Sequence, residues 1–352
     1  MDEQKQLMDL DARLSPAFKK LRDIPVCMEG LQCMRYKNEL IICGGTNNSN
    51  CYSYHLRKRE YKFICAYPKG TKLKEHVVIK FGDTSSGRIT LLSFGGYYKH
   101  TLQMDYQSVW EKPKEHLNEW KNCHYEIGEA DDNLFQARAL IGGNNNNLLF
   151  VIYNPGYILA LDIENSFKCV AKRRLPIDGI CGGSCFVKCK DKMIFLNYYH
   201  NVAITYNDSN HQIEFRTFSV DHDVRHYCSF SYVYINEVIV IFGGFASGEH
   251  HSEKIFVYSV KRNKWKTSSE ILPIGLFNSS AVLHDIHRCA HILGGLGNIG
   301  ATNLHFKVNL FSIIGITGKD IQSIVQNWQR RIKLKHIGWI DEFNDIIADF
   351  LW

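Results

Sequence analysis

The sequence predicts an all-β fold, a six-bladed β-propeller, because one strand pattern recurs six times along the 352 residues. In the best copy, residues 237–273, an apolar strand ends in Gly243-Gly244, and a polar loop and two further strands follow before Pro273. The copies repeat at a period near 50 residues, which is typical of propeller blades. Since one copy cannot bury its apolar residues alone, the copies are expected to pack together in a ring.

Four of the copies end their second strand in a pair of glycines, and two are degenerate. The pairs are Gly44-Gly45, Gly95-Gly96, Gly243-Gly244 and Gly294-Gly295, and the degenerate copies have Asn154-Pro155 and Tyr198-Tyr199 instead. Gly142-Gly143 imitates a further pair. However, eight candidate strands lie between Gly96 and Tyr199, enough for two whole blades. Strand counting therefore assigns 137–141 to the first strand of blade 3 and 148–153 to its second.

Each blade is expected to have four strands, a to d, counted outward from the axis. The expected strands are 31–36, 39–43, 51–55 and 61–66 in blade 1; 77–81, 89–94, 101–106 and one near Trp120 in blade 2; 137–141, 148–153 and two beginning near Ile158 and Phe167 in blade 3; 184–189, 192–197, 202–206 and 213–218 in blade 4; 229–234, 238–242, 255–258 and one carrying Trp265 in blade 5; and 280–283, 289–293 and 304–308 in blade 6. Residues 107–118 are expected to form a polar insertion in blade 2.

Blade 6 lacks a strand d before the pattern changes. The segment from Phe18 to Pro25 matches the ends of blades 1 and 5, where an aromatic residue precedes an apolar residue and a proline. We therefore expect the N-terminus to supply this strand from about residues 17–24, so that the ring closes without an open edge. The expected organisation is an N-terminal arm at 1–14, a propeller over 15–314 and a short C-terminal α-helical tail, a helical pair, over 317–352.

The tail changes from strand periodicity to helix periodicity. Ile321, Ile324, Val325 and Trp328 fall at helical spacing and predict an amphipathic helix. Its apolar face is expected to pack within the protein. The alternative is that a partner or a membrane surface contacts it, in which case Trp328, Arg330 and Arg331 are the candidates for a secondary contact.

Composition argues against several classes of function. The net charge of +6 is too dilute to indicate nucleic-acid binding. The acidic N-terminus is unlike a secretory signal, and no apolar run is long enough for a transmembrane segment. The 12 cysteines, mostly in apolar strands, are expected to be reduced thiols in a cytoplasmic protein.

The stretches ELIICGG…CYSYHL…YKFICAYP and EVIVIFGG…IFVYSV…NKWKTSSEILP resemble the kelch motif. The resemblance covers about residues 18–311 and implies a β-propeller that binds other proteins. It implies that the four glycine pairs end strand b, where positive φ and close packing between blades are needed. It also implies that Tyr258 and Trp265 fill the space between neighbouring blades.

The sequence singles out no catalytic, cofactor or metal residues. Cys181, Cys185 and Cys189 lack the spacing of a zinc site, and core packing is expected of them. Hydrogen-bonded or solvated roles are expected of His284, His287 and His291, which fall across a hairpin, and of His250-His251, which lie in a polar loop.

The expected function is a non-enzymatic protein-interaction module, a scaffold or adaptor that presents loops to an unidentified protein or peptide. The candidate loops are 46–50, 97–100, 245–253 and 296–301, and their candidate contact residues are Asn47, Asn48, Tyr97, Tyr98, His100, Phe245, His250 and Asn298. The alternative is an enzyme with a site in the central channel, such as a copper oxidase resembling galactose oxidase. Acidic, His or Tyr side chains converging in the channel would favour the enzyme.

Overall fold

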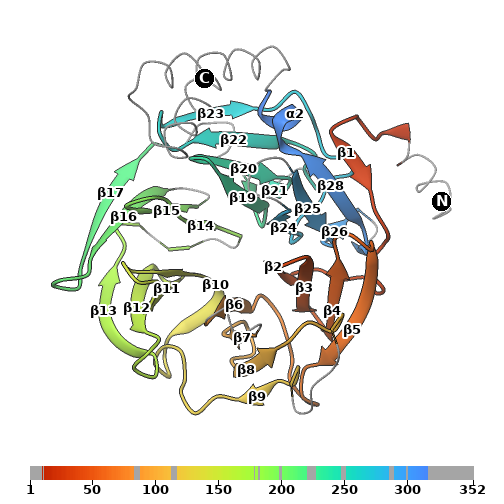
Figure 1. Ribbon diagram of the computed structural model, residues 1–352. Coiled ribbons are helices and arrows are strands. Elements are labelled where there is room, and N and C mark those ends of the chain that lie inside the picture. The colour runs from red at the N-terminus through yellow and green to blue at the C-terminus, as the bar shows by residue number, and fades with distance from the viewer. Residues whose placement is uncertain are drawn as a thin grey trace, which may run out of the picture.

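A computed structural model describes residues 10, 12–82, 88–111, 117–177, 179–180, 183–197, 200–219, 227–246, 251–284, 289–298 and 300–315. Six four-stranded antiparallel sheets are arranged as blades around a central axis (Figure 1). The predicted six-bladed β-propeller is confirmed. Within the described ranges, no helix has the length and apolarity that a membrane crossing requires.

The blades follow one another in chain order. Blade 1 contains β2 (Gln32–Tyr36), β3 (Glu39–Gly45), β4 (Asn48–His55) and β5 (Glu60–Ala66); blade 2 contains β6 (Val77–Phe81), β7 (Ile89–Phe94), β8 (Thr101–Tyr106) and β9 (Lys121–Asn122); blade 3 contains β10 (Asn133–Gly142), β11 (Leu148–Asn154), β12 (Tyr157–Asp162) and β13 (Lys168–Arg174). Blade 4 contains β14 (Cys185–Lys188), β15 (Met193–Leu196), β16 (Asn201–Asn207) and β17 (Gln212–Phe218); blade 5 contains β19 (Ser231–Ile235), β20 (Val238–Phe242), β22 (Ile255–Ser259) and β23 (Lys264–Thr267). Gly142 ends the first strand of blade 3, as strand counting predicted.

Blade 6 is completed from the other end of the chain. Its strands are β24 (Ser280–Leu283), β25 (Cys289–Leu293), β28 (His305–Asn309) and β1 (Phe18–Lys20), and β1 pairs antiparallel with β28. The predicted closure by the N-terminus is therefore confirmed. The regular ladder ends at Lys20, so it is shorter than the expected 17–24, although Leu21 N and Ile24 N still donate to the backbone of His305 and Asn303. Ile24, 1% exposed, already packs in the core of blade 1.

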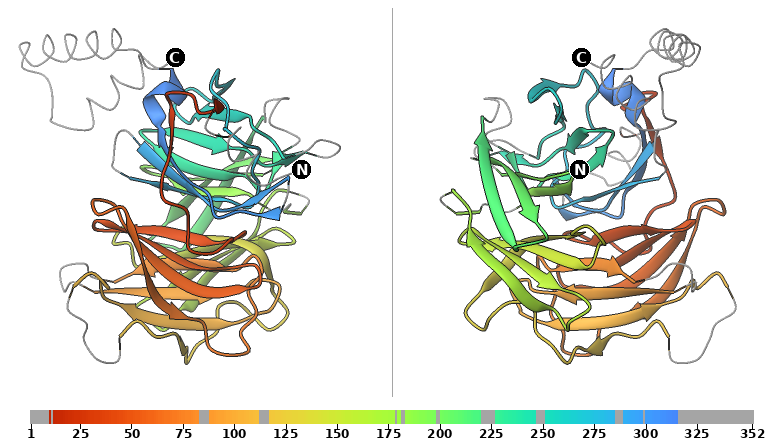
Figure 2. Two further views of the ribbon diagram at one scale, coloured as in Figure 1. Left: turned by 90° about the vertical axis from the view of Figure 1, so that its right-hand side faces the viewer. Right: turned by 60° about the vertical axis from the view of Figure 1, so that its left-hand side comes forward.

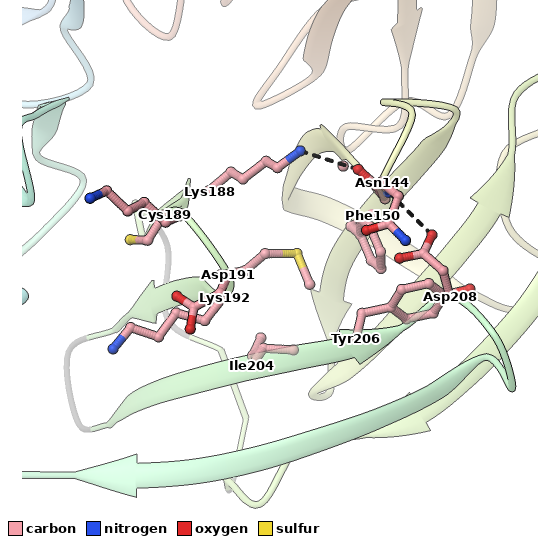
Figure 3. A pocket seen from close by; sticks show the side chains of 13 residues that line it. Asn144, Phe150, Lys188, Cys189, Asp191, Lys192, Ile204, Tyr206 and Asp208 are labelled. Carbon is pink, nitrogen blue, oxygen red and sulfur yellow. Dashed lines mark hydrogen bonds between the residues drawn. The ribbon is translucent and has the colours of Figure 1, made fainter. Parts of the chain in front are cut away.

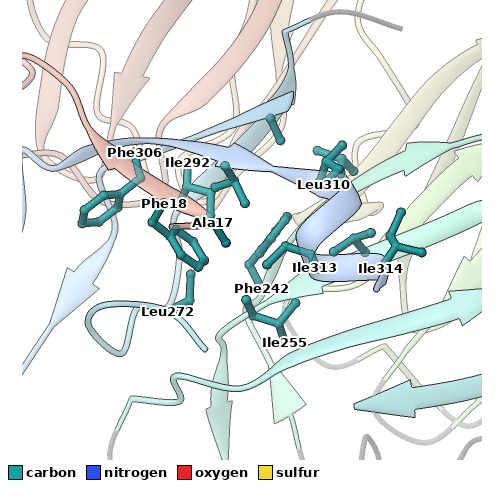
Figure 4. Close-up of a cluster of buried hydrophobic side chains, with 14 of the residues drawn as sticks. Ala17, Phe18, Phe242, Ile255, Leu272, Ile292, Phe306, Leu310, Ile313 and Ile314 are labelled. Atoms are coloured by element: carbon teal, nitrogen blue, oxygen red, sulfur yellow. The ribbon is translucent and has the colours of Figure 1, made fainter. Parts of the chain in front are cut away.

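A short helix that the sequence did not reveal covers the closure. This helix, α2 (Leu310–Ile314), begins at Asn309, whose side chain accepts a hydrogen bond from Phe311 N, and ends at Gly315 in the left-handed conformation. The buried side chains of α2 join the core that contains Phe18, as Figure 4 shows. The expected helical pair at 317–352, with Trp328, Arg330 and Arg331, lies outside the described residues.

The second strand of each blade is buried on both faces, since each face lies against a neighbouring blade. All seven residues of β3 and all five of β20 are buried. This placement explains why these strands read as continuous apolar runs and not as alternating patterns. The cores therefore lie between blades, as in the cluster that joins Leu92 of blade 2 to Leu149 of blade 3.

Trp110, in the segment expected to form a polar insertion (107–118), contacts blade 1. Trp110 Nε1 donates a 2.8 Å hydrogen bond to Ser53 Oγ, and Ser53 in turn donates to the buried carboxylate of Glu39. Tyr106 Oη donates to the same Glu39 oxygen at 2.6 Å. The insertion thus joins blades 1 and 2 through a shared polar network.

Candidate functional site

The loops that follow strand b gather on one face of the ring. Strand direction alternates within every blade, so the loops between strands b and c and the segments from strand d to the next strand a lie on the same side. We call this side the b–c face. Loops project from both faces in the side views of Figure 2.

The glycine pairs let the start of each b–c loop pass close to the backbone of a neighbouring segment. The first glycine of each pair has positive φ, with +63° at Gly243 and +56° at Gly294. A Cβ atom at Gly243 would lie 2.3 Å from Leu276 O, and one at Gly294 would lie 2.4 Å from Met28 O. Hydrogen therefore fits at these points and a methyl group does not. The remaining pair residues occupy the equivalent places: Gly44 and Gly45 end β3, and Gly95, Gly96, Gly244 and Gly295 follow β7, β20 and β25.

Tyr258 and Trp265 lie at the seam between blades 4 and 5. Tyr258 is 2% exposed, and its ring stacks on Phe218 of blade 4 with 5.7 Å between centroids. Its other neighbour is Trp265, at 4.7 Å between centroids. Both rings therefore fill space between blades, away from the loops.

Two exposed tyrosines dominate the b–c loop of blade 2. Tyr97 is 62% exposed and Tyr98 is 41% exposed, with 5.0 Å between their ring centroids. Phe135, in the bulge of β10 between the paired residues Asn133 and Arg138, has its ring centroid 5.9 Å from that of Tyr97. Lys74 Nζ lies 5.5 Å from the Tyr97 ring and Lys72 Nζ 5.4 Å from the Tyr98 ring. These five residues form what we call the Tyr97 patch, an aromatic surface carrying two exposed ammonium groups.

A second aromatic group lies on the b–c face at blade 5. Phe245, 39% exposed, lies on β21 (Phe245–Ala246), which pairs with β18 (Tyr227–Cys228). Its ring is 5.9 Å from that of Phe277, which also contacts His251 at 4.7 Å between centroids. The expected loop at 245–253 thus begins with a β-ribbon.

The other candidate loop residues divide between exposed tips and strands. Asn47 is exposed in a two-residue turn, but Asn48 begins β4, so the expected loop at 46–50 was too long. Asn298 is exposed at the tip of a hairpin formed by β26 (Leu296–Gly297) and β27 (Gly300–Ala301). His100 is half-buried and hydrogen-bonded to Ser93 Oγ at 2.8 Å, and burial lowers its pKa. His250 lies outside the described residues.

A polar bridge joins two segments at the inner rim of the b–c face. Asn278 Nδ2 donates to Glu75 Oε1 at 2.8 Å, linking the segment before blade 6 to the one before blade 2. Gly30 N donates to the backbone of Asn278 at 2.8 Å, which adds the segment before blade 1. Glu75 is nearly buried, and this burial raises its pKa, while the charge of Arg138 opposes the increase. These hydrogen bonds therefore hold the three segments together between the Tyr97 patch and the aromatic group of Phe245 and Phe277.

The central channel holds a cavity of about 470 Å³ between the first strands of blades 5, 6 and 1. Its polar lining includes Cys33, Arg35, Tyr232 and Tyr234. The Tyr232 hydroxyl is bonded to the backbone of Phe186, accepting from its N at 3.2 Å and donating to its O at 3.3 Å. Burial raises the pKa of Tyr232 to about 12.

A smaller cleft of about 100 Å³ lies on the opposite face, between the turns of blades 3 and 4 (Figure 3). Lys188 Nζ donates to Gly143 O at 3.3 Å, and Asn144 N donates to Asp208 Oδ1 at 3.2 Å. These polar groups satisfy one another, so the cleft is a seam between blades.

The cysteines and the histidines considered for metal binding lie in separate parts of the ring. Among the described residues, no group of three or more His, Cys, Asp or Glu side chains is arranged to hold a metal ion. Cys185 and Cys189 are buried in the core between blades 4 and 5, while Cys181 and His287 lie outside the described part of the chain. His284 and His291 are hydrogen-bonded to each other at 2.7 Å.

Comparison with known proteins supports the same architecture. The kelch motif model matches residues 226–270. A search of curated protein sequences gives no match. Among solved structures, one reported as the structure of YjhT aligns with a TM-score of 0.61 at 13% identity, covering 81% of this chain and 95% of its own. The chain is thus a six-bladed β-propeller that carries a kelch motif at residues 226–270.

Proposed function

We propose that the protein is a non-enzymatic scaffold or adaptor that binds a peptide segment of another protein on its b–c face. One observation carries the proposal. Of the five exposed large hydrophobic side chains among the described residues, four lie on this face: Tyr97, Tyr98 and Phe245 follow strand b, and Ile271 lies between strand d of blade 5 and strand a of blade 6. Exposed apolar groups that gather on one face mark interaction sites more often than singly scattered ones.

The chemistry of the Tyr97 patch suits a particular kind of peptide. Tyrosines offer large contact areas at low entropic cost, and they are enriched among the residues that dominate binding energy. Lys72 and Lys74 are exposed beside the two rings, so their ammonium groups are available to carboxylates. A segment that combines an apolar side chain with Asp or Glu therefore complements this surface.

The alternative, an enzyme with a site in the channel, has one observation in its favour. The 470 Å³ cavity falls within the size range of small-molecule sites. Against it, the Tyr232 hydroxyl is already engaged by the backbone of Phe186. The likeness to the structure of YjhT concerns the fold and does not choose between the two functions.

Selection of peptides from a displayed random library on the purified propeller tests the proposal. The selected peptides are expected to be acidic and to lose at least about 30-fold in affinity for the double variant Tyr97→Ser/Tyr98→Ser, since truncation of one dominant tyrosine costs about 2 kcal/mol. Isothermal titration calorimetry measures the loss.

The matched control is Phe63→Ser, because Phe63 is 56% exposed but lies on β5 at the outside of blade 1. Its affinity is expected to equal that of the unmodified protein. Equal binding by the tyrosine double variant would contradict the assigned surface. Tyr234 lines the channel cavity. If Tyr234→Leu loses peptide binding while the tyrosine double variant binds fully, the peptide binds in the channel and not on the b–c face.

A further inference from the structure

Four side chains form an unbroken hydrogen-bonded chain between the last blade and the first. His284 Nδ1 and His291 Nε2 are 2.7 Å apart, and His291 Nδ1 and His305 Nε2 are also 2.7 Å apart. His305 Nδ1 then lies 2.7 Å from the hydroxyl of Tyr61, on β5 of blade 1. We call this series the histidine chain.

The histidine chain lies where the ring is closed. His305 is the first residue of β28, and its backbone carbonyl accepts a 2.8 Å hydrogen bond from Leu21 N, directly after β1. The His305 ring packs edge-on against Tyr54 of blade 1, with 4.6 Å between centroids. His291 is 1% exposed and His305 is fully buried. The two inner imidazoles therefore connect blade 6 to blade 1, while the backbone of His305 is bonded to the segment directly after β1.

Counting protons shows how many this arrangement tolerates. A neutral imidazole donates through one nitrogen and accepts through the other. Three neutral histidines and one tyrosine hold four protons, three in the chain's hydrogen bonds and one at an end. If both inner histidines are charged, the facing nitrogens of His291 and His305 both carry protons, so the hydrogen bond between them must break.

The surroundings disfavour charge on the inner histidines. Burial, followed by the neighbouring His305 and His284 and the cations Lys307 and Arg35, lowers the pKa of His291 to about 2. Burial lowers the pKa of His305 to about 3, opposed by its contact with the backbone carbonyl of Arg22.

The groups on the blade 1 side give little compensation. Tyr61 has Cys33, Tyr54 and Asp23 as its electrostatic neighbours, and Asp23 is the carboxylate among them. This carboxylate acts on Tyr61, whereas the ionic side chains of the described residues that act on His291, Lys307 and Arg35, are cations.

We propose that the histidine chain is a pH-sensitive latch on the ring closure, which holds blade 6 to blade 1 when neutral and releases β1 from β28 by taking up two protons. Opening exposes His291 and His305 to water, and each of them then takes up a proton. Because each takes up a proton only when open, the ratio of open to closed molecules rises about 100-fold per pH unit once the pH falls below about 6.

Native-state hydrogen exchange of the full chain, measured by mass spectrometry between pH 7 and 5 and corrected for intrinsic exchange rates, tests the latch. Peptides containing β1 and β28 are expected to open about 100-fold more per pH unit, and peptides containing β11 and β12 of blade 3 much less. In His291→Gln, whose amide donates and accepts but does not titrate, the slope for β1 and β28 is expected to fall to about tenfold.

The matched control is His76→Gln, since His76 is also fully buried with a lowered pKa but lies beside Cys43 and His100, away from β1. This variant is expected to keep the steep slope for β1 and β28. An unchanged slope in His291→Gln, or opening of blade 3 in step with β1, would overturn the latch. If His291→Gln does not fold, imidazole NMR of the unmodified protein decides. Charged His291 and His305 at a pH where β1 remains protected would refute the proposal.

Discussion

Removal of residues 1–24 is expected to abolish the cooperative unfolding of the propeller. The deletion removes β1 and, with it, Phe18, which is 5% exposed and meets Phe306 edge-on at 6.5 Å between ring centroids. It also removes Ile24 from the core of blade 1. Losing one buried aromatic and one buried aliphatic side chain costs about 5–10 kcal/mol, which is comparable with the whole net stability of a domain.

Thermal unfolding followed by circular dichroism, together with size-exclusion chromatography, measures this effect. The truncated chain is expected to show a broad transition and to self-associate, because β28 becomes an unpaired edge. Removal of residues 1–9 is the control, since it leaves β1 intact. A sharp transition at an unchanged midpoint after removal of 1–24 would show that the ring does not depend on this strand.

Gly294→Val is expected to destabilise the propeller by about 2–6 kcal/mol. The backbone there has φ of +56°, which a β-branched residue adopts only under strain of about 1–3 kcal/mol. The added Cβ atom would lie 2.4 Å from both Met28 O and Leu31 Cδ2, so the strand end and the following segment must move apart. Such overpacking typically costs a further 1–3 kcal/mol or so.

Urea unfolding measures the two contributions separately when Gly70→Val serves as control. Gly70 has φ of +94°, and an added Cβ atom there would meet nothing within 4 Å. This control bears backbone strain without the collision, so the difference between the variants isolates the cost of close packing. Equal midpoints for the two variants would mean that the contact at Gly294 relaxes freely.

The six blades could be predicted because each blade has a local residue pattern of apolar strands and turns. Strand runs and glycine pairs located four blades, and strand counting recovered blades 3 and 4, where Asn154-Pro155 and Tyr198-Tyr199 replace the glycines. The closing strand was found because Phe18 and Pro25 repeat the pattern of other blade ends, an aromatic residue followed by an apolar residue and a proline. Each of these signals lies within one short stretch of chain.

Features that depend on distant contacts were missed. Helix α2 has five residues, too few for a periodic pattern, and the ribbon of β18 and β21 has two residues in each strand. The sequence placed His284 and His291 in one hairpin, but His305 and Tyr61 join them only when the ring closes. Similarly, Tyr97 and Tyr98 were candidates, whereas the contributions of Phe135 and Lys74 come from neighbouring segments.

The pairing of β1 with β28 also imposes an order of events on biosynthesis. Phe18 emerges from the ribosome early, but its partner Val308 follows about 290 residues later, roughly 15–60 seconds at ordinary elongation rates. Blades 1 to 5 contain all their own strands and can form during that interval. Until it ends, β1 has no strand to pair with, and the ring of Phe18 lacks its edge-on contact with Phe306.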